Sequence, residues 1–185
     1  MVRRRCRFIV VSDASCDPSF SLDDLGNSIR KIRTDLGIPI YMDDVHFETR
    51  NETSNTSAYC AIGKIDYAAR DGGEAPLGTL LYIKASLGEN LSVDVFNYAK
   101  SSKDFSHEPT SDQWFSESQF ESYRRLGEEA IEVISQRRHF KRSWESDFVS
   151  PVRDNLVEFE IFMRNAESHL RHYVQNGQNG KQQPA

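Results

Sequence analysis

Apolar and polar positions at the start of the chain predict a βα unit. Residues 7–13 form a short apolar run rich in β-branched side chains that ends in a polar Ser-Asp pair. This pattern is typical of a strand buried on both faces, as in a parallel sheet. Ser21 is then expected to cap a helix whose first turn holds Asp23 and Asp24, and Gly37 is expected to end it. The apolar stripe of this helix consists of Leu22, Leu25, Ile29, Ile32 and Leu36.

Between residues 38 and 87 the pattern changes to short strands. Turn-rich loops at 51–57 and 69–76 separate these runs. Because neighbouring strands joined by a loop favour an antiparallel hairpin, the sheet is expected to be mixed. The expected strands are 38–42, 45–49, 59–67 and 78–87.

The last part of the chain is expected to be helical. Residues 92–103 predict a short helix, and Ser116 with Gln119 forms a capping box for a helix that runs to about Arg137. Ser150 followed by proline predicts another helix start. Both longer helices carry apolar stripes with a period of 3.5, typical of helices packed side by side, so we expect a helical hairpin. The stripes are Phe120, Tyr123, Gly127, Ala130 and Ile134, then Val152, Leu156, Phe159, Met163, Ala166, Leu170 and Tyr173.

These elements predict an α/β fold with helical additions. Residues 1–137 form the α/β domain, 138–149 a basic linker, and 150–176 a C-terminal amphipathic helix. The Gly-, Gln- and Asn-rich tail at 177–185 is expected to be disordered. Self-association through the helix at 150–174 is one interpretation of its regular stripe.

Composition narrows the functional classes. The net charge of −5 argues against a nucleic-acid binder. Cys6, Cys16 and Cys60 are odd in number and form no CxxC pair, so we expect reduced, half-buried thiols and no zinc site. The apolar stretch near the start covers only residues 8–11, shorter than the roughly 7–15 residues of a signal peptide. No run approaches the roughly 18 apolar residues of a membrane span, so a soluble, cytoplasmic chain is expected.

Motifs that would define an active site are missing from the sequence. It contains no GxSxG, GxGxxG or GxxxxGK[ST], and the first βα turn reads Ser-Asp-Ala-Ser-Cys-Asp-Pro over residues 12–18. Asp13 follows the first strand, where open α/β sheets bind ligands. It is therefore either a ligand-binding or catalytic carboxylate, or a turn residue that accepts hydrogen bonds from loop amides.

Histidines do not form an evident site either. His169 and His172 share a helix face, but no carboxylate follows at a matching spacing, so a solvated pair explains them better than a metal site. His46, His107 and His139 stand alone, with no serine or cysteine that the sequence places in a triad. We therefore assign no catalytic, cofactor-binding or metal residue and expect no cofactor.

A basic run interleaved with aromatic residues spans 137–144. One interpretation is contact with an anionic lipid or membrane surface, which would make the protein membrane-peripheral. The other is a helix end that favours cations, followed by an exposed linker. The residues concerned are Arg137, Arg138, Lys141, Arg142 and Trp144.

Several separated segments resemble the bacterial patatin-like phospholipases, in the order expected for that family. The resemblance covers about residues 2 to 127. The segments are VRRRCRFIVVSDA at 2–14, DLGNSIRKIR at 24–33, residues 59–66, GTLLYIK at 78–84, HEPTSDQWF at 107–115 and ESQFESYR at 117–124. The resemblance implies that 1–137 is the C-terminal part of a patatin-like α/β domain.

In that family a GxSxG serine attacks a lipid ester, an aspartate in Asp-Gly-Gly/Ala is its base, and a glycine-rich loop forms the oxyanion hole. The resemblance implies that all three lie before Met1. Asp71 begins an Asp-Gly-Gly here, but it lies between two expected strands and is better explained as a hairpin turn. The resemblance therefore implies that the chain is the C-terminal part of a lipid acyl hydrolase, inactive alone. The alternative is a non-catalytic binding or regulatory module that dimerises or grips a partner through its 3.5-period helices.

Overall fold

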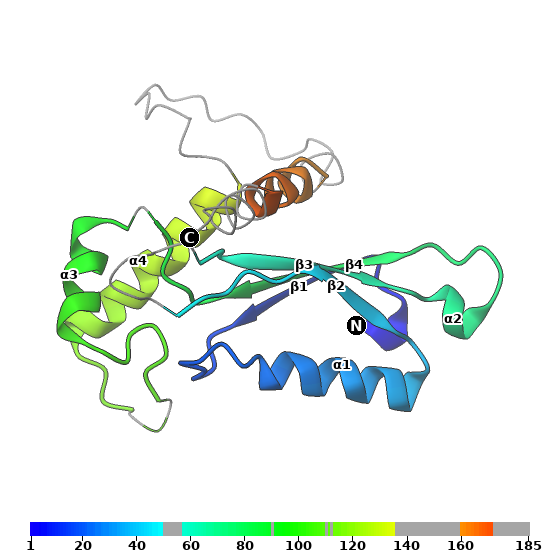
Figure 1. The fold of residues 1–185 in the computed structure, drawn as a ribbon, viewed down its shortest axis with the longest axis horizontal. Helices are drawn as coiled ribbons and strands as arrows, with labels where there is room; N and C mark the ends of the chain where they lie inside the picture. The colour runs from blue at the N-terminus through cyan, green and yellow to red at the C-terminus, as the bar shows by residue number, and fades with distance from the viewer. Residues whose placement is uncertain (50–56, 90, 110, 112, 136–159, 172–185) are drawn as a thin grey trace, which may run out of the picture.

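The apolar run at the start of the chain forms one edge of a four-stranded mixed sheet. A computed structural model describes residues 1–49, 57–89, 91–109, 111, 113–135 and 160–171. The strand order is β1-β4-β3-β2, with β1 parallel to β4 and the other neighbours antiparallel (Figure 1). The expected mixed sheet and the β3–β4 hairpin are therefore confirmed. The strands are β1 (Phe8–Asp13), β2 (Ile40–Asp44), β3 (Cys60–Ile65) and β4 (Gly78–Lys84).

The second strand region differs from its prediction. β2 begins two residues later than expected, since Pro39 has no N–H to donate to a strand ladder. Residues 45–49 do not form the expected strand. Instead, the His46 carbonyl accepts a hydrogen bond from the Ala58 N–H at 2.8 Å, and the Glu48 N–H donates to Ser57 Oγ at 3.2 Å.

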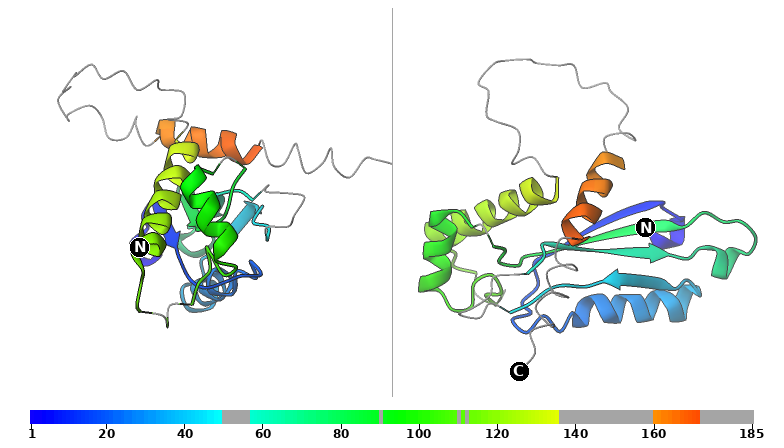
Figure 2. Two further views of the ribbon diagram at one scale, coloured as in Figure 1. Left: turned by 90° about the vertical axis from the view of Figure 1, so that its left-hand side faces the viewer. Right: turned by 45° about the horizontal axis from the view of Figure 1, so that its top comes forward.

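Helix α1 (Asp23–Leu36) covers one face of the sheet (Figures 1 and 2). Gly37 ends it as expected, with φ of 66° and its N–H bonded to the Arg33 carbonyl at 3.0 Å. The expected cap at Ser21 is wrong, because the residue before the helix is Leu22 and no side chain caps there. The apolar stripe packs against the sheet, but no α1 residue is fully buried.

The Asp17 carboxylate fixes the turn that leads into α1. It accepts hydrogen bonds from the N–H of Ser21 and the N–H of Leu22, both at 2.8 Å, and from Ser21 Oγ at 3.0 Å. An anionic acceptor one turn before α1 satisfies donors that would otherwise have no partner at the helix start.

A second buried core lies apart from the one between α1 and the sheet. It includes residues of α3 (Val93–Ser101), of α4 (Glu117–Ile134) and of the helical residues 160–171. The stripe predicted for α4 is partly wrong: Phe120 is 62% exposed, whereas the buried positions include Gln119, Ser122 and Glu129. Ser116 Oγ does accept the Gln119 N–H at 3.1 Å. The Gln119 side chain does not complete the capping box, because it donates to Glu108 Oε2 at 2.8 Å instead.

The C-terminal helix is described over residues 160–171 only. Met163, Ala166 and Leu170 are buried in the core cluster that also contains α4 residues, as the stripe predicts. Asn165 Nδ2 donates to the Ser135 carbonyl at 2.9 Å. The basic linker at 138–149, the first part of the predicted helix from 150 and the tail at 177–185 lie outside the described residues, as does the connection of the predicted hairpin.

β1 departs from its prediction in burial. The parallel pairing is confirmed, but β1 is an edge strand and is not buried on both faces. Ile9 is buried, whereas Phe8, Val10 and Val11 are exposed.

The described residues also contain two short elements, the 3-10 helix η1 (Val2–Arg4) and the helix α2 (Ala68–Asp71).

Candidate functional site: a polar cluster at the carboxyl ends of β1 and β4

Polar side chains gather where the two parallel strands end. Asp13 is the last residue of β1 and its register partner Lys84 is the last residue of β4. Ligands of open α/β sheets bind outside the carboxyl ends of parallel strands. This end of the β1–β4 pair is therefore the candidate site.

The Asp13 carboxylate is surrounded by donors. Oδ1 accepts the Ser15 N–H at 2.8 Å, the turn interaction that was one of the two interpretations of Asp13. Oδ2 accepts hydrogen bonds from the Tyr82 hydroxyl and from Lys84 Nζ, the latter at 3.1 Å. Asp13, at the end of β1, is thus hydrogen-bonded both to the loop that follows it and to side chains of β4.

These donors set the ionisation of Asp13. Burial by itself would raise the pKa of Asp13, but the hydrogen bonds from Tyr82, Ser15 and Lys84 outweigh it and lower this pKa to about 2. Burial together with the bond to Asp13 raises the pKa of Tyr82. Near neutral pH the pair is therefore a carboxylate and a neutral phenol, and a carboxylate of such low pKa is a weak general base.

Lys84 is fully satisfied within the cluster. Its side chain is 1% exposed, and Nζ donates to Asp13 Oδ2, to Ser15 Oγ at 3.1 Å and to the Ser15 carbonyl at 3.3 Å. An ammonium group has three donors, so these three acceptors use all of them. A serine–lysine catalytic pair needs an amine that is free to take the serine proton. Here Ser15 Oγ accepts from Lys84, so the arrangement holds the loop in place.

His107 reaches the same end of the sheet from the loop before α4. Its Nδ1 accepts the Asp17 N–H at 3.4 Å, and its ring lies edge-on to Phe20 with centroids 4.6 Å apart. Burial lowers the pKa of His107, so the imidazole is neutral near neutral pH. The sequence alone does not connect His107 with Asp17, because the two residues are 90 positions apart.

Glu108 fixes the loop that carries His107. Its Oε1 accepts the Tyr98 hydroxyl at 3.0 Å and Ser102 Oγ at 2.6 Å, and its N–H donates to the Tyr123 hydroxyl at 3.2 Å. With the Gln119 contact, one residue joins α3, the loop and α4. The position of His107 thus follows from the packing of these two helices.

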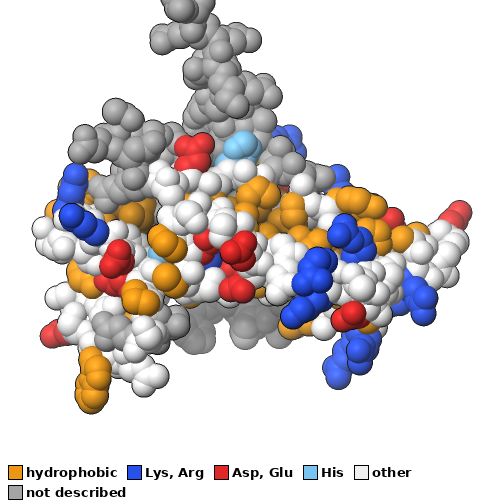
Figure 3. All heavy atoms as spheres, turned by 60° about the horizontal axis from the view of Figure 1, so that its bottom comes forward, with side chains coloured by type: hydrophobic (Ala, Val, Ile, Leu, Met, Phe, Trp, Pro, Cys, Tyr) orange, Lys and Arg blue, Asp and Glu red, His pale blue; other side chains and the backbone are white. Residues whose placement is uncertain are grey.

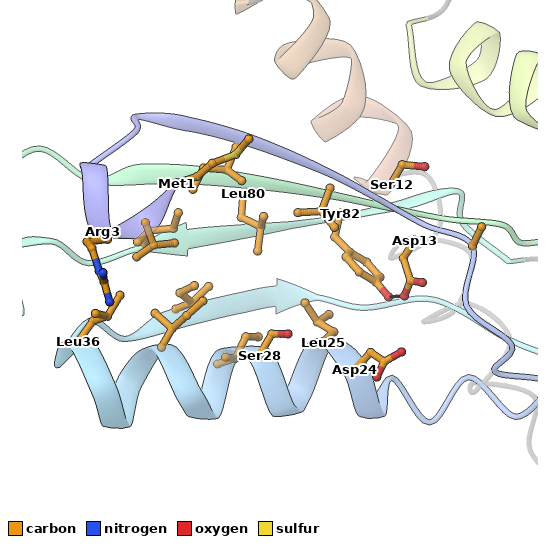
Figure 4. Close-up of a pocket in the computed structure, with 18 residues that line it drawn as sticks. Met1, Arg3, Ser12, Asp13, Asp24, Leu25, Ser28, Leu36, Leu80 and Tyr82 are labelled. Atoms are coloured by element: carbon orange, nitrogen blue, oxygen red, sulfur yellow. Dashed lines mark hydrogen bonds between the residues drawn. The ribbon is translucent and has the colours of Figure 1, made fainter.

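An apolar cavity of about 550 Å³ lies between α1 and the sheet (Figure 4). Tyr82, Asp13 and Asp24 lie at one end, next to the polar cluster, and Arg3 and Leu36 at the other. Pockets lined mainly by aliphatic side chains with a few polar groups are typical of sites for apolar ligands or chain segments. The aliphatic lining comes from Ile9, Val11, Leu25, Ile29, Ile32, Leu36, Ile40, Ile65 and Leu80.

Asp71 lies at the other end of the sheet. It is the last residue of α2, in the connection that leads into the amino end of β4. Its carboxylate forms a two-pronged ion pair with Arg5, with Oδ2 2.5 Å from Nε and Oδ1 2.6 Å from Nη2. Asp71 is therefore a structural ion-pair residue and stands apart from the polar cluster.

The remaining candidates from the sequence are either packed against other side chains or lie outside the described residues. His169 is half-buried and stacks on Tyr59 with centroids 6.1 Å apart, so the expected solvated environment is wrong for it. His139, His172 and the basic run at 137–144 lie outside the described residues. In the described part of the chain, no three His, Cys, Asp or Glu residues are grouped to hold a metal. None of the helices described there combines the length and the apolar composition of a membrane span.

The three cysteines are free thiols, but only Cys6 is half-buried as expected. Cys16 is exposed and Cys60 is buried, and burial raises the pKa of Cys60 to about 12. A thiol with so high a pKa is a poor nucleophile at neutral pH.

Comparison with family models, curated proteins and solved structures finds no match to this chain.

Proposed function

We propose that residues 1–137 are the C-terminal part of a patatin-like serine acyl hydrolase, which hydrolyses lipid esters only together with the rest of the enzyme. One observation carries this proposal. Three of the segments that resemble the family are far apart in sequence, yet each contributes to the polar cluster at the carboxyl end of the parallel strands. They supply Asp13, the Tyr82–Lys84 stretch of β4, and His107. This end of an α/β sheet is where hydrolases of such architecture hold their substrates.

The chemistry of the cluster supports a role that depends on other residues. Lys84 and Asp13 neutralise one another, and the Ser15 hydroxyl accepts from Lys84. Among the described residues of this cluster, no serine lies beside a free base. The apolar cavity that ends at Asp13 and Tyr82 is compatible with an enzyme of lipid esters. A serine and its base from elsewhere are needed for turnover.

Ester hydrolysis by the purified chain tests the proposal directly. We expect no hydrolysis of p-nitrophenyl esters of short or long acyl chains above the buffer rate. Turnover that is blocked by a serine-reactive phosphonate would contradict the proposal. The reading frame upstream of Met1 gives an independent check, since the proposal requires an in-frame GxSxG followed by Asp-Gly-Gly/Ala.

The alternative, a module that grips a partner with its 3.5-period helices, has less support. Met163, Ala166 and Leu170 already pack into the core of this chain with Leu126 and Ala130 of α4. An apolar stripe that is buried within its own chain is not available for a partner. Contact of the basic run at 137–144 with anionic lipid stays a prediction.

A further inference from the structure

The outer edge of β1 directs backbone hydrogen-bonding groups away from the sheet. β1 is the first strand in the order, with β4 as its neighbour. The Thr79 N–H donates to the Arg7 carbonyl at 2.7 Å, so residue 7 and alternate residues after it point toward β4. In a parallel ladder the N–H and C=O of one residue point to the same side. Val10 and Ser12 therefore direct theirs outward, where the described part of the chain has no strand.

β1 also exposes apolar side chains on both of its faces. Val10 is 46% exposed on one face and its neighbour Val11 is 38% exposed on the other. Strands that are apolar on both faces belong in the interior of a covered sheet. An open edge of this composition is a template for another strand. The sequence of β1 is thus that of an internal strand, although β1 lies at the edge.

The apolar cavity borders the same strand. Ile9 and Val11 of β1 line it from the sheet, and Leu25 and Ile29 of α1 line it from the helix. In Figure 3, which shows the α1 side of the molecule, apolar side chains are visible between acidic and basic groups. Protein interiors are packed as densely as organic crystals, so an aliphatic space of about 550 Å³ beside an open strand lacks side chains that belong to it.

We propose that a β-strand from the catalytic portion of the hydrolase pairs with β1 along this edge and places aliphatic side chains in the cavity. This inference rests on the proposed function. The partner strand is apolar on both faces, so that one set of side chains enters the cavity and the other covers Val10. A second copy of this chain fits less well, because its own β1 borders an equally unfilled cavity.

Co-expression of two separately tagged polypeptides tests the inference. One is the chain of residues 1–185, and the other is the polypeptide encoded in frame upstream of it. Val10→Pro removes an N–H that faces the open edge and leaves the β1–β4 ladder intact, since proline is tolerated on the solvent side of edge strands. We expect the wild-type chain to be retained by the upstream polypeptide, and Val10→Pro to weaken retention at least about tenfold, or about 1.4 kcal/mol.

Matched variants separate edge pairing from loss of folding. Phe120→Lys changes an apolar residue on α4 that is more exposed than Val10 and should leave retention unchanged. If Val10→Pro lowers the cooperativity of thermal unfolding, Val10→Lys replaces it, because a lysine on an edge strand opposes strand addition. Hydrogen exchange should show the amides of Val10 and Ser12 protected in the complex and open in the isolated chain.

The outcomes distinguish this inference from the proposed function. Retention that is equal for wild type, Val10→Pro and Val10→Lys overturns edge pairing but leaves a two-part hydrolase in place. An upstream polypeptide that lacks the serine motif, or does not bind, overturns the proposed function and with it the inference. A Val10→Cys chain in which Cys6 and Cys16 are replaced by serine, so that residue 10 is the accessible thiol, tests the second copy: a disulfide-linked homodimer identifies that copy as the occupant and also overturns the inference. Two-fold antiparallel pairing at residue 10 would place the Cα atoms about 5.5 Å apart, within disulfide range.

Discussion

Lys84 Nζ lies 3.1 Å from Asp13 Oδ2, and this ion pair joins the last residues of two parallel strands. The two residues are 71 positions apart and are direct register partners. The lysine side chain is 1% exposed and the aspartate side chain 13% exposed. Removing one partner of such a buried pair leaves the other charge without compensation.

Lys84→Met should therefore destabilise the chain by about 3 kcal/mol, as measured by urea unfolding. The double variant Lys84→Met with Asp13→Asn should recover part of this loss, because it removes both charges. Lys31→Met, on the exposed side of α1, should change the free energy of unfolding by less than about 0.5 kcal/mol. A single variant at Lys84 as stable as Lys31→Met would show that the pair contributes nothing.

The lowered pKa of Asp13 predicts a dependence of stability on pH. Its value of about 2 in the folded chain lies below the ordinary value of 3.8, so the folded state favours the carboxylate. This contribution is fully present above pH 3.8 and is lost as the pH falls toward 2. After allowance for solvent screening it amounts to about 1–2 kcal/mol. Unfolding of wild type and Asp13→Asn between pH 2 and 6 should show a steeper slope for wild type; equal slopes would contradict the assignment.

The hydrogen bonds of Asp17 predict that Asp17→Ala lowers the stability of the chain more than Ser21→Ala does. Asp17→Ala removes all three hydrogen bonds that the carboxylate accepts before α1, including those from the Ser21 and Leu22 N–H groups. It should cost about 1–2 kcal/mol of unfolding free energy and lower the helical circular dichroism. Ser21→Ala loses only one hydroxyl donor and should cost clearly less. The reverse order would restore Ser21 as the cap.

Local pattern predicts three of the strands and the end of α1 correctly, but it fails for the strand expected at 45–49. Period and β-branched content identify β1, β3 and β4, and Gly37 marks the helix end because its positive φ favours glycine. The sequence does not predict the start of α1 correctly, because the carboxylate that accepts the Ser21 and Leu22 N–H groups belongs to Asp17, five residues before Leu22. A side chain that bonds to backbone N–H groups several residues ahead can take the place of a simple N-cap, and it leaves no periodic pattern of apolar residues in the sequence.

The polar cluster was not predictable from spacing alone. In the sequence, Lys84 is simply a polar residue at the end of an apolar strand. Only the parallel pairing of β1 with β4 brings its side chain to Asp13. On α4 the buried polar residues Gln119 and Glu129 have specific partners, Glu108 and the Ser92 N–H, so they occupy positions that a hydrophobicity pattern assigns to apolar residues. Long-range hydrogen bonds of this kind override local pattern.

The Glu108 contacts have a consequence for how this end of the molecule opens. A single carboxylate holds Tyr98 and Ser102 on the α3 side and Gln119 on α4. Neither helix can move away without breaking bonds that also restrain the other. The two helices and the loop between them therefore form one cooperative unit, and their amides should become accessible to solvent in a single opening event rather than helix by helix.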